Sequence, residues 1–185
     1  AQLDPESSEY HMVVTLALDG ALRVDVLQAS LDALLQRHEA LRTVFETVDG
    51  EPMQRILPAS TWPIVHDDLS GVDAATRDDA LLAAARAEAQ RPFDLATDLP
   101  CRGRLLRLDD GHAMLVLVLH HIVSDGWSMD MLSAELAQVY RALADGRDPA
   151  LPAPVVRYID VAAWQNARLH DGMREQQRYW LQALA

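Results

Sequence analysis

The sequence predicts a fold of the α+β class, because strand patterns and helix patterns follow one another along a chain of 185 residues, 50% of them hydrophobic. The unbroken apolar run at 114–119 has the length of a buried strand and is too short to cross a membrane. Leucines recur at helical spacing between residues 27 and 35. A chain of this length and apolar content can bury one sizeable core.

The first part of the chain predicts a strand, a helix and a hairpin. Residues 10–18 have a strand-like composition and end at an Asp-Gly turn signal. A helix is predicted over 25–37, where the leucines line one face that we expect to lie in the core. The Asp-Gly pair at 49–50 then predicts a tight turn between a strand that ends at Val48 and a second strand at 53–57.

The middle of the chain predicts a short strand at 64–67, a helix at 74–90 and a second hairpin. The helix has high helix propensity but only a modest apolar face, so its charges are expected to be solvated. Two strands, at 102–108 and 112–119, flank an Asp-Asp-Gly turn and form the hairpin. The second of these strands contains the long apolar run.

The last part of the chain predicts helices. One is expected to begin at Ser128, which can cap it, with Asp130 in its first turn. A loop rich in Gly and Pro at 145–154 is expected to be a connector within the domain. The next segment is expected to be a helix that buries three side chains, Tyr158, Val161 and Trp164. A final helical stretch is predicted at 173–184.

The composition excludes several classes of protein. A net charge of -12 and a pI near 4.8 argue against a nucleic-acid partner and against binding to an anionic membrane surface. The single cysteine, Cys101, excludes an intrachain disulfide and a cysteine-based zinc site. With no signal peptide or spanning segment in the sequence, we expect a cytoplasmic protein. All 16 basic residues are arginine, which is typical of a GC-rich bacterial genome.

Four polar or flexible residues lie between the apolar run and the helix that follows it: His120, His121, Asp125 and Gly126. Each of these residue types alone is mostly structural at the end of a strand. Together they indicate an active-site loop, because a loop held by a rigid strand and helix is where reactive side chains are usually displayed. An imidazole can accept or share a proton near neutral pH.

The pattern His-His-x-x-x-Asp-Gly at 120–126 resembles the active-site signature of the condensation domains of nonribosomal peptide synthetases, which belong with the chloramphenicol acetyltransferase-like acyltransferases. Residues 37–45 are similar to the family motif Arg-His-Glu-x-Leu-Arg-Thr-x-Phe. Residues 158–164 resemble a third motif, Tyr-x-Asp-aromatic-Ala-x-Trp, with Val161 at the aromatic position. The resemblance implies that residues 1–185 form the N-terminal lobe of such a domain, a half-domain with a mixed β-sheet flanked by helices, and that the C-terminal lobe is absent.

The resemblance also implies a reaction. In the family, the amine of an acceptor aminoacyl group attacks the thioester of a donor acyl group, and both groups are carried on phosphopantetheine arms. The implied partners are donor and acceptor peptidyl carrier domains, the C-terminal lobe and an adjacent adenylation domain. The lobe itself is expected to bind no cofactor and no metal. It is expected to be inactive alone, because its site would be open on one side.

The matching motifs suggest a role for each residue of the loop. His121 is predicted to be catalytic, as a general base or as a group that orients the amine. Gly126 is predicted to let the thioester approach the backbone, with its amide near the oxyanion. Trp127 and Ser124 are candidates for the wall of the substrate tunnel. Ser124 as a nucleophile is the competing idea, but the sequence lacks a nucleophile elbow.

Three further residues are predicted to support the site. His120 is expected to point away from His121 if it still belongs to the strand, which makes its role structural. The resemblance suggests that Arg42 forms an ion pair with Asp125, because a buried carboxylate needs a partner. Adjacent histidines at the end of a strand diverge, so a metal site is not expected.

Two other functions compete with condensation. One is a non-catalytic relative that recruits partner proteins, although such domains tend to lose motif residues that this sequence keeps. The other is a free-standing acyltransferase of the same fold that uses a soluble acyl thioester. Epimerisation domains usually continue the motif as Asp-x-x-Ser-Trp-Arg, and cyclisation domains replace the two histidines with aspartates, so both are disfavoured.

Overall fold

The computed structural model describes residues 7–184, apart from the side chains of residues 169–172 and 174. The chain divides into two compact units between Leu151 and Pro152. The first unit contains the sheet and most of the helices, and the second contains one long helix.

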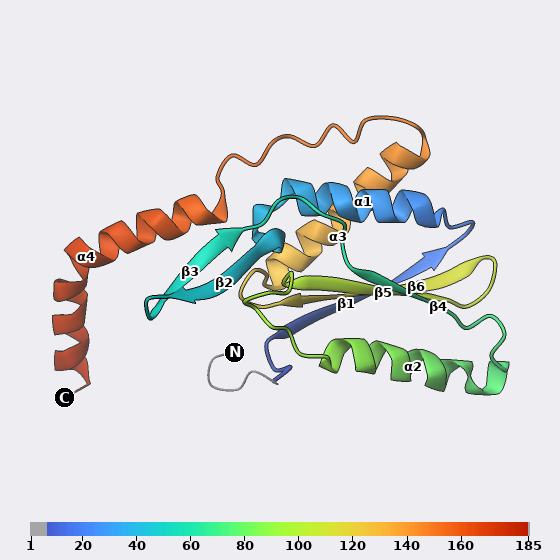
Figure 1. The fold of residues 1–185 in the computed structure, drawn as a ribbon, viewed down its shortest axis with the longest axis horizontal. Coiled ribbons are helices and arrows are strands. Elements are labelled where there is room, and N and C mark those ends of the chain that lie inside the picture. The colour runs from blue at the N-terminus through green and yellow to red at the C-terminus, as the bar shows by residue number, and fades with distance from the viewer. Residues whose placement is uncertain (1–6, 185) are drawn as a thin grey trace. The chain divides into compact units, whose positions relative to one another are not determined.

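A four-stranded mixed sheet forms the centre of the first unit, and its strands are ordered β1-β6-β5-β4 (Figure 1). The strands are β1 (His11–Asp19), β6 (His112–His120), β5 (Cys101–Arg107) and β4 (Ile64–Asp68). Neighbouring strands run antiparallel except β4 and β5, which are parallel. A separate two-stranded hairpin consists of β2 (Thr43–Val48) and β3 (Glu51–Ile56). The predicted mixed sheet flanked by helices is confirmed.

Helices cover both faces of this sheet. On one face lie α1 (Val24–Arg37) and α3 (Gly126–Ala144), and on the other lies α2 (Ala74–Gln90) (Figure 1). A short 3₁₀ helix, η1 (Glu39–Arg42), joins α1 to the hairpin. The first unit is therefore a three-layer arrangement with β6 as its central, doubly covered strand.

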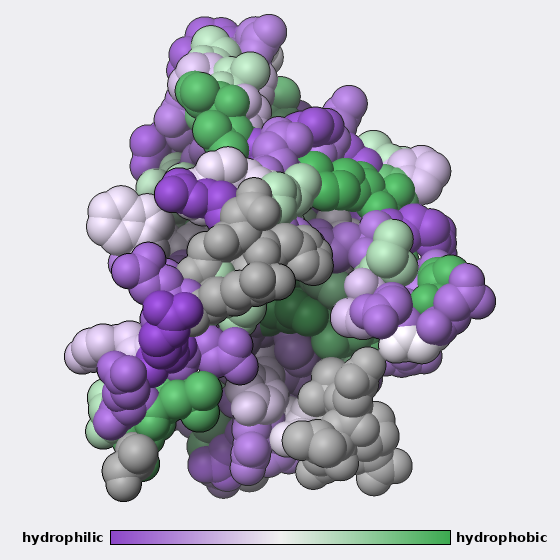
Figure 2. All heavy atoms as spheres, turned by 90° about the vertical axis from the view of Figure 1, so that its left-hand side faces the viewer, coloured by the Kyte–Doolittle hydropathy of each residue, from purple (hydrophilic) through white to green (hydrophobic). Residues whose placement is uncertain are grey.

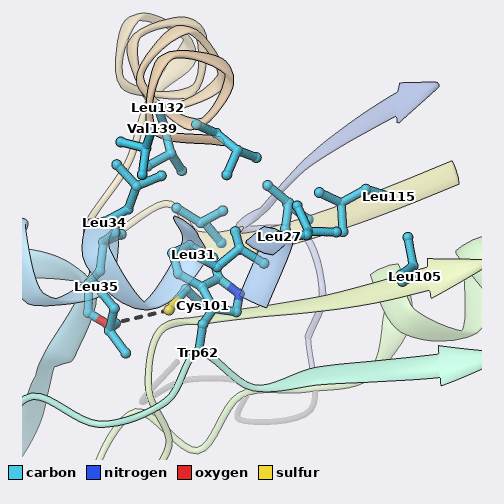
Figure 3. Packing of buried hydrophobic residues seen from close by; sticks show 14 of the residues in the cluster. Leu27, Leu31, Leu34, Leu35, Trp62, Cys101, Leu105, Leu115, Leu132 and Val139 are labelled. Atoms are coloured by element: carbon cyan, nitrogen blue, oxygen red, sulfur yellow. Dashed lines mark hydrogen bonds between the residues drawn. The ribbon is translucent and has the colours of Figure 1, made fainter. Parts of the chain in front are cut away.

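The side chains of β6 alternate between two cores. Leu115, Leu117 and Leu119 pack with the leucines of α1 and with α3, whereas Val116 and Val118 pack with Phe93 and Leu106 on the α2 side. Figure 3 shows the first of these cores, in which α1 and α3 side chains meet those of β5 and β6. Fully burying an apolar side chain of this size contributes about 1.5–3 kcal/mol. These contacts hold the end of β6 in place.

One charged residue of α2 corrects the prediction that the charges of this helix are solvated. Three of the five are exposed, but the carboxylate of Glu88 is buried, with 1% of its side chain exposed. It forms ion pairs with Arg102 at 2.8 Å, with Arg104 at 3.0 Å and with Arg91 at 2.7 Å. Burial acts to raise its pKa, but hydrogen bonds from Arg91 and Arg104 bring the pKa below its usual value. The modest apolar face of α2 reflects this charged contact with β5.

The second unit consists mainly of α4 (Tyr158–Ala183), one helix where the sequence predicted two helical stretches. The prediction that three of its side chains are buried is wrong in this structure, because Tyr158, Val161 and Trp164 are 53%, 42% and 59% exposed. Arg157 and Asp160 cap its first turn with an ion pair of 2.8 Å.

Hydrophilic side chains dominate the face that Figure 2 shows, and hydrophobic side chains appear there only in smaller groups. Across residues 7–184, every helix is too short or too polar to cross a membrane.

Candidate active site

The motif loop joins the end of β6 to the start of α3, and hydrogen bonds to the chain on both sides of β6 hold its beginning. The backbone N–H of His120 donates to the carbonyl of Pro100 at 2.9 Å. The backbone N–H of His121 donates to the carbonyl of Tyr10 at 2.7 Å. The loop therefore starts from a strand whose last residues are fixed by the neighbouring chain on each side.

His120 is the inward histidine, with 8% of its surface exposed. Its Nδ1 accepts a hydrogen bond of 3.1 Å from the N–H of Ile122, which places the proton of the neutral ring on Nε2. The ring lies 6.1 Å from Phe93, edge to face, and 6.2 Å from Tyr10, stacked. The prediction that this histidine is structural agrees with these contacts.

Electrostatics keep His120 neutral. Burial lowers its pKa to about 4, and the nearby His11 and His121 contribute in the same direction. To become positively charged, the ring would have to take a proton on Nδ1, and that proton would displace the hydrogen bond from the N–H of Ile122. At neutral pH this ring is a hydrogen-bond acceptor inside the loop.

His121 takes the opposite orientation and is exposed. Among the described residues its ring makes no side-chain hydrogen bond, ion pair or ring contact. The first two residues of α3 are also open to solvent: Trp127 is 83% exposed, and a Cβ placed on Gly126 would meet no atom within 4 Å. The structure thus places three of the four residues to which the sequence assigned contact with substrate on an accessible stretch of chain; the fourth is Ser124.

Asp125 is the N-cap of α3, which corrects the predicted start of this helix. Its Oδ1 accepts from the backbone N–H of Ser128 at 2.8 Å and from the Ser128 hydroxyl at 2.6 Å, so α3 begins at Gly126 and not at Ser128. These hydrogen bonds lower the pKa of Asp125, and His121 contributes less. The carboxylate is thus ionised at neutral pH without an arginine partner.

The predicted ion pair between Arg42 and Asp125 is wrong in this structure. Arg42 pairs with Glu39 at 3.5 Å within η1, and its guanidinium donates to the carbonyl of Leu57 after β3. Asp125 is exposed and already bonded to Ser128. The premise of a buried, unpaired carboxylate does not apply, because a cap carboxylate at a helix start is solvated and satisfied locally.

Ser124 faces the interior of the loop. It is 6% exposed, and its hydroxyl donates to the carbonyl of His120 at 3.1 Å. This contact argues against the predicted place of Ser124 in the tunnel wall, because the hydroxyl closes the turn. Among the side chains that the structure describes, no group of three or more His, Cys, Asp or Glu residues could hold a metal ion.

A comparison with known protein families matches residues 1–185 to the model of the condensation domain. The chain belongs to the condensation-domain family. It is 42% identical to malpibaldin synthetase of Mortierella alpina over 187 residues, which cover 100% of this chain and 3% of that protein. It is 39% identical to phosphinothricin tripeptide synthetase PhsB of Streptomyces viridochromogenes, over 100% of this chain and 16% of that protein.

A solved structure shows the same fold. The first condensation domain of the calcium-dependent antibiotic synthetase, in complex with a substrate analogue, superposes with a TM-score of 0.81 at 28% identity. The match covers 99% of this chain and 43% of that one, so the present chain spans less than half of a solved condensation domain. The predicted chloramphenicol acetyltransferase-like fold is confirmed. The composition predicted a bacterial source, and the relatives come from both fungi and bacteria.

The family motif at residues 37–45 has a structural role that the sequence did not reveal. Arg37 and His38, at the end of α1, both bind Glu135 of α3, at 3.3 Å and 2.6 Å. The three side chains are about four-fifths buried. This ion-pair cluster fixes α3, and with it the helix start at Gly126, against α1.

Sequence reasoning missed the residues beneath the loop. His11 lies opposite His120 in the β1–β6 register, and its ring is 5.1 Å from Phe93 and 6.1 Å from the ring of His120. The guanidinium of Arg102 lies 3.7 Å from the centroid of the Phe93 ring. The pairing of β1 with β6 has no local signal, so only the three-dimensional structure brings these residues together.

Proposed function

We propose that the chain is the N-terminal lobe of a condensation domain and contributes the active-site loop for peptide-bond formation in nonribosomal peptide synthesis. The observation that carries the proposal is the contrast between two adjacent histidines. His120 is buried and neutral, whereas His121 is exposed on a loop whose ends are fixed. A reactive imidazole needs both access to substrate and a fixed position.

In the proposed reaction the acceptor amine attacks the donor thioester carbonyl, a C–N bond forms and the C–S bond breaks. The carrier thiol leaves, and the amine loses one proton. His121 accepts or shares that proton, or orients the amine by a hydrogen bond.

Gly126 and Trp127 are proposed to contact the carrier-bound groups. The open space at Gly126, in the first turn of α3, would admit a thioester to the backbone, where the helix N-terminus favours a developing negative charge. Trp127 offers a large exposed aromatic surface beside it. Ser124 is left out of this set because its hydroxyl is used within the turn.

The proposed partners are donor and acceptor carrier domains, which bring the phosphopantetheine arms, together with an adenylation domain and the second lobe. The lobe is proposed to bind no cofactor of its own. It is also proposed to be inactive alone, because His121 and Trp127 are exposed and water would reach the thioester. A cytoplasmic location is part of the proposal and agrees with the free thiol of Cys101.

The test uses the complete two-lobed domain with loaded donor and acceptor carriers, and follows the condensed product on the acceptor by intact-protein mass spectrometry. His121→Ala is expected to lower the rate by roughly a hundred- to ten-thousandfold, as loss of a general acid or base does. His112→Ala, which removes an exposed histidine at the β5–β6 turn, serves as the matched control and should keep wild-type activity. No product from the wild type, with correctly loaded carriers and a sound fold, would overturn the proposal in favour of a recruiting relative.

A further inference from the structure

Two residues at the entry to β1, Tyr10 just before the strand and His11 at its start, together contact both motif histidines. The carbonyl of Tyr10 accepts from the backbone N–H of His121, and the Tyr10 ring stacks on the ring of His120. The next residue, His11, pairs with His120 in the strand register and packs edge to face against its ring. The chain that enters β1 therefore determines where the backbone of His121 lies.

This start of β1 is itself held by one side-chain hydrogen bond to another element. Nδ1 of His11 lies 2.7 Å from the carbonyl of Ala89, in the last turn of α2, so the ring donates through Nδ1–H. Figure 1 shows the end of α2 beside the start of β1. The bond crosses 78 residues of sequence and joins the α2 layer to the strand edge that holds His121.

We propose that His11 is a positioning residue for His121, an inference that rests on the catalytic role proposed above for His121. The hydrogen bond from Nδ1 to Ala89 fixes the start of β1, and the carbonyl of Tyr10 passes this constraint to the amide of His121. His11 touches no reacting group. Its effect is on the geometry of the loop, where a displacement of about 1 Å can cost a hundredfold in rate.

Two substitutions separate this hydrogen bond from simple packing. His11→Asn keeps a donor, because the Asn amide nitrogen occupies nearly the same place as Nδ1, but it loses most of the ring. His11→Phe keeps an aromatic ring against Phe93 and His120 but has no donor. If the hydrogen bond positions the loop, Asn preserves the behaviour of the wild type and Phe does not. If His11 acts only by packing, the order is reversed.

The first measurement is amide hydrogen exchange by NMR on this chain, with the amide of Leu117 in the middle of β6 as internal reference. In His11→Phe the amide of His121 is expected to exchange about five- to tenfold faster, the factor that corresponds to loss of one hydrogen bond. Leu117 should be unchanged, and His11→Asn should match the wild type at both positions. Wild-type exchange of His121 in the Phe variant, or faster exchange in the Asn variant, would overturn the proposal. If the amide of Leu117 also exchanges faster in the Phe variant, the Asn variant alone decides: wild-type exchange at His121 supports the proposal, and faster exchange overturns it.

The second measurement is the rate of condensation in the two-lobed domain with loaded carriers. His11→Phe is expected to lower kcat by about tenfold or more with little change in KM. His11→Asn is expected to keep the kcat of the wild type. A Phe variant with wild-type kcat would overturn the link to catalysis. If the wild type forms no product while the exchange results hold, the proposed function fails and the positioning of His121 stands.

Discussion

Mild acid should destabilise the fold through His120. In the unfolded chain its imidazole has an ordinary pKa of 6.5, but burial in the folded chain lowers the pKa to about 4. The unfolded state therefore binds a proton at a higher pH than the folded state does, so acid favours unfolding. The stability that depends on this ring is fully present above pH 6.5 and is lost as the pH falls toward 4.

The size of the effect follows from these two pKa values. Between pH 7.5 and pH 5.0 the linkage relation gives a loss of about 2 kcal/mol in the free energy of unfolding from His120 alone. His11 acts in the same direction, because burial lowers its pKa too and its buried Nε2 has no hydrogen-bond partner among the described residues. The carboxylates whose pKa values are lowered titrate mostly below this window.

The assay is urea denaturation of this chain at pH 7.5 and pH 5.0. In His120→Asn a side-chain oxygen can still accept from the N–H of Ile122, but no titrating group remains, so the acid-induced loss should shrink by about 2 kcal/mol. His66→Gln, which removes an exposed histidine from β4, is the matched control and should lose as much as the wild type. An equal loss in His120→Asn and the wild type would refute the reasoning.

Four substitutions test other parts of the structure, each by urea denaturation except the last. Glu135→Gln removes the carboxylate that binds Arg37 and His38 at the end of α1 and should cost about 1–3 kcal/mol, less than for a fully buried pair. Asp125→Ala removes the cap of α3 and should cost about 1 kcal/mol, most of which Asp125→Asn should restore. Gly103→Ala places a Cβ 3.1 Å from Cδ2 of Leu117, so overpacking should cost about 1–3 kcal/mol. Arg42→Ala should leave the NMR-measured pKa of Asp125 unchanged, since the hydrogen bonds from Ser128 are what lower it. A rise in this pKa would show that Arg42 and Asp125 do form an ion pair.

Local patterns in the sequence predicted most elements of the first unit. The helix predicted at 74–90 has those bounds in the structure, and the strand predicted at 112–119 ends one residue later. These elements follow from side-chain periodicity and turn residues, which are properties of neighbouring positions. The order of strands in the sheet was not predicted, because the pairing of β1 with β6 joins segments about a hundred residues apart.

The errors have a common physical origin in how charged residues find partners. The sequence argument for Arg42 assumed a buried Asp125, whereas the aspartate is exposed and bonded to Ser128, three positions along the chain. Conversely, the pattern of α2 predicts solvated charges, although Arg91 after the helix and Arg102 and Arg104 of β5 all pair with its buried Glu88. Whether a carboxylate is buried depends on tertiary packing, which helix periodicity alone does not determine.

The two motif histidines illustrate what sequence adjacency leaves undetermined. Alternation along β6 predicts that His120 and His121 point to opposite sides, but not which side is enclosed. Enclosure comes from Phe93 after α2 and from Tyr10 and His11 at β1, which surround one ring. That ring is thereby kept neutral, and its Nδ1 accepts from the turn that presents the other histidine. The chemical difference between two identical side chains is therefore produced by the strand beside them, which makes the start of β1 a part of the active site.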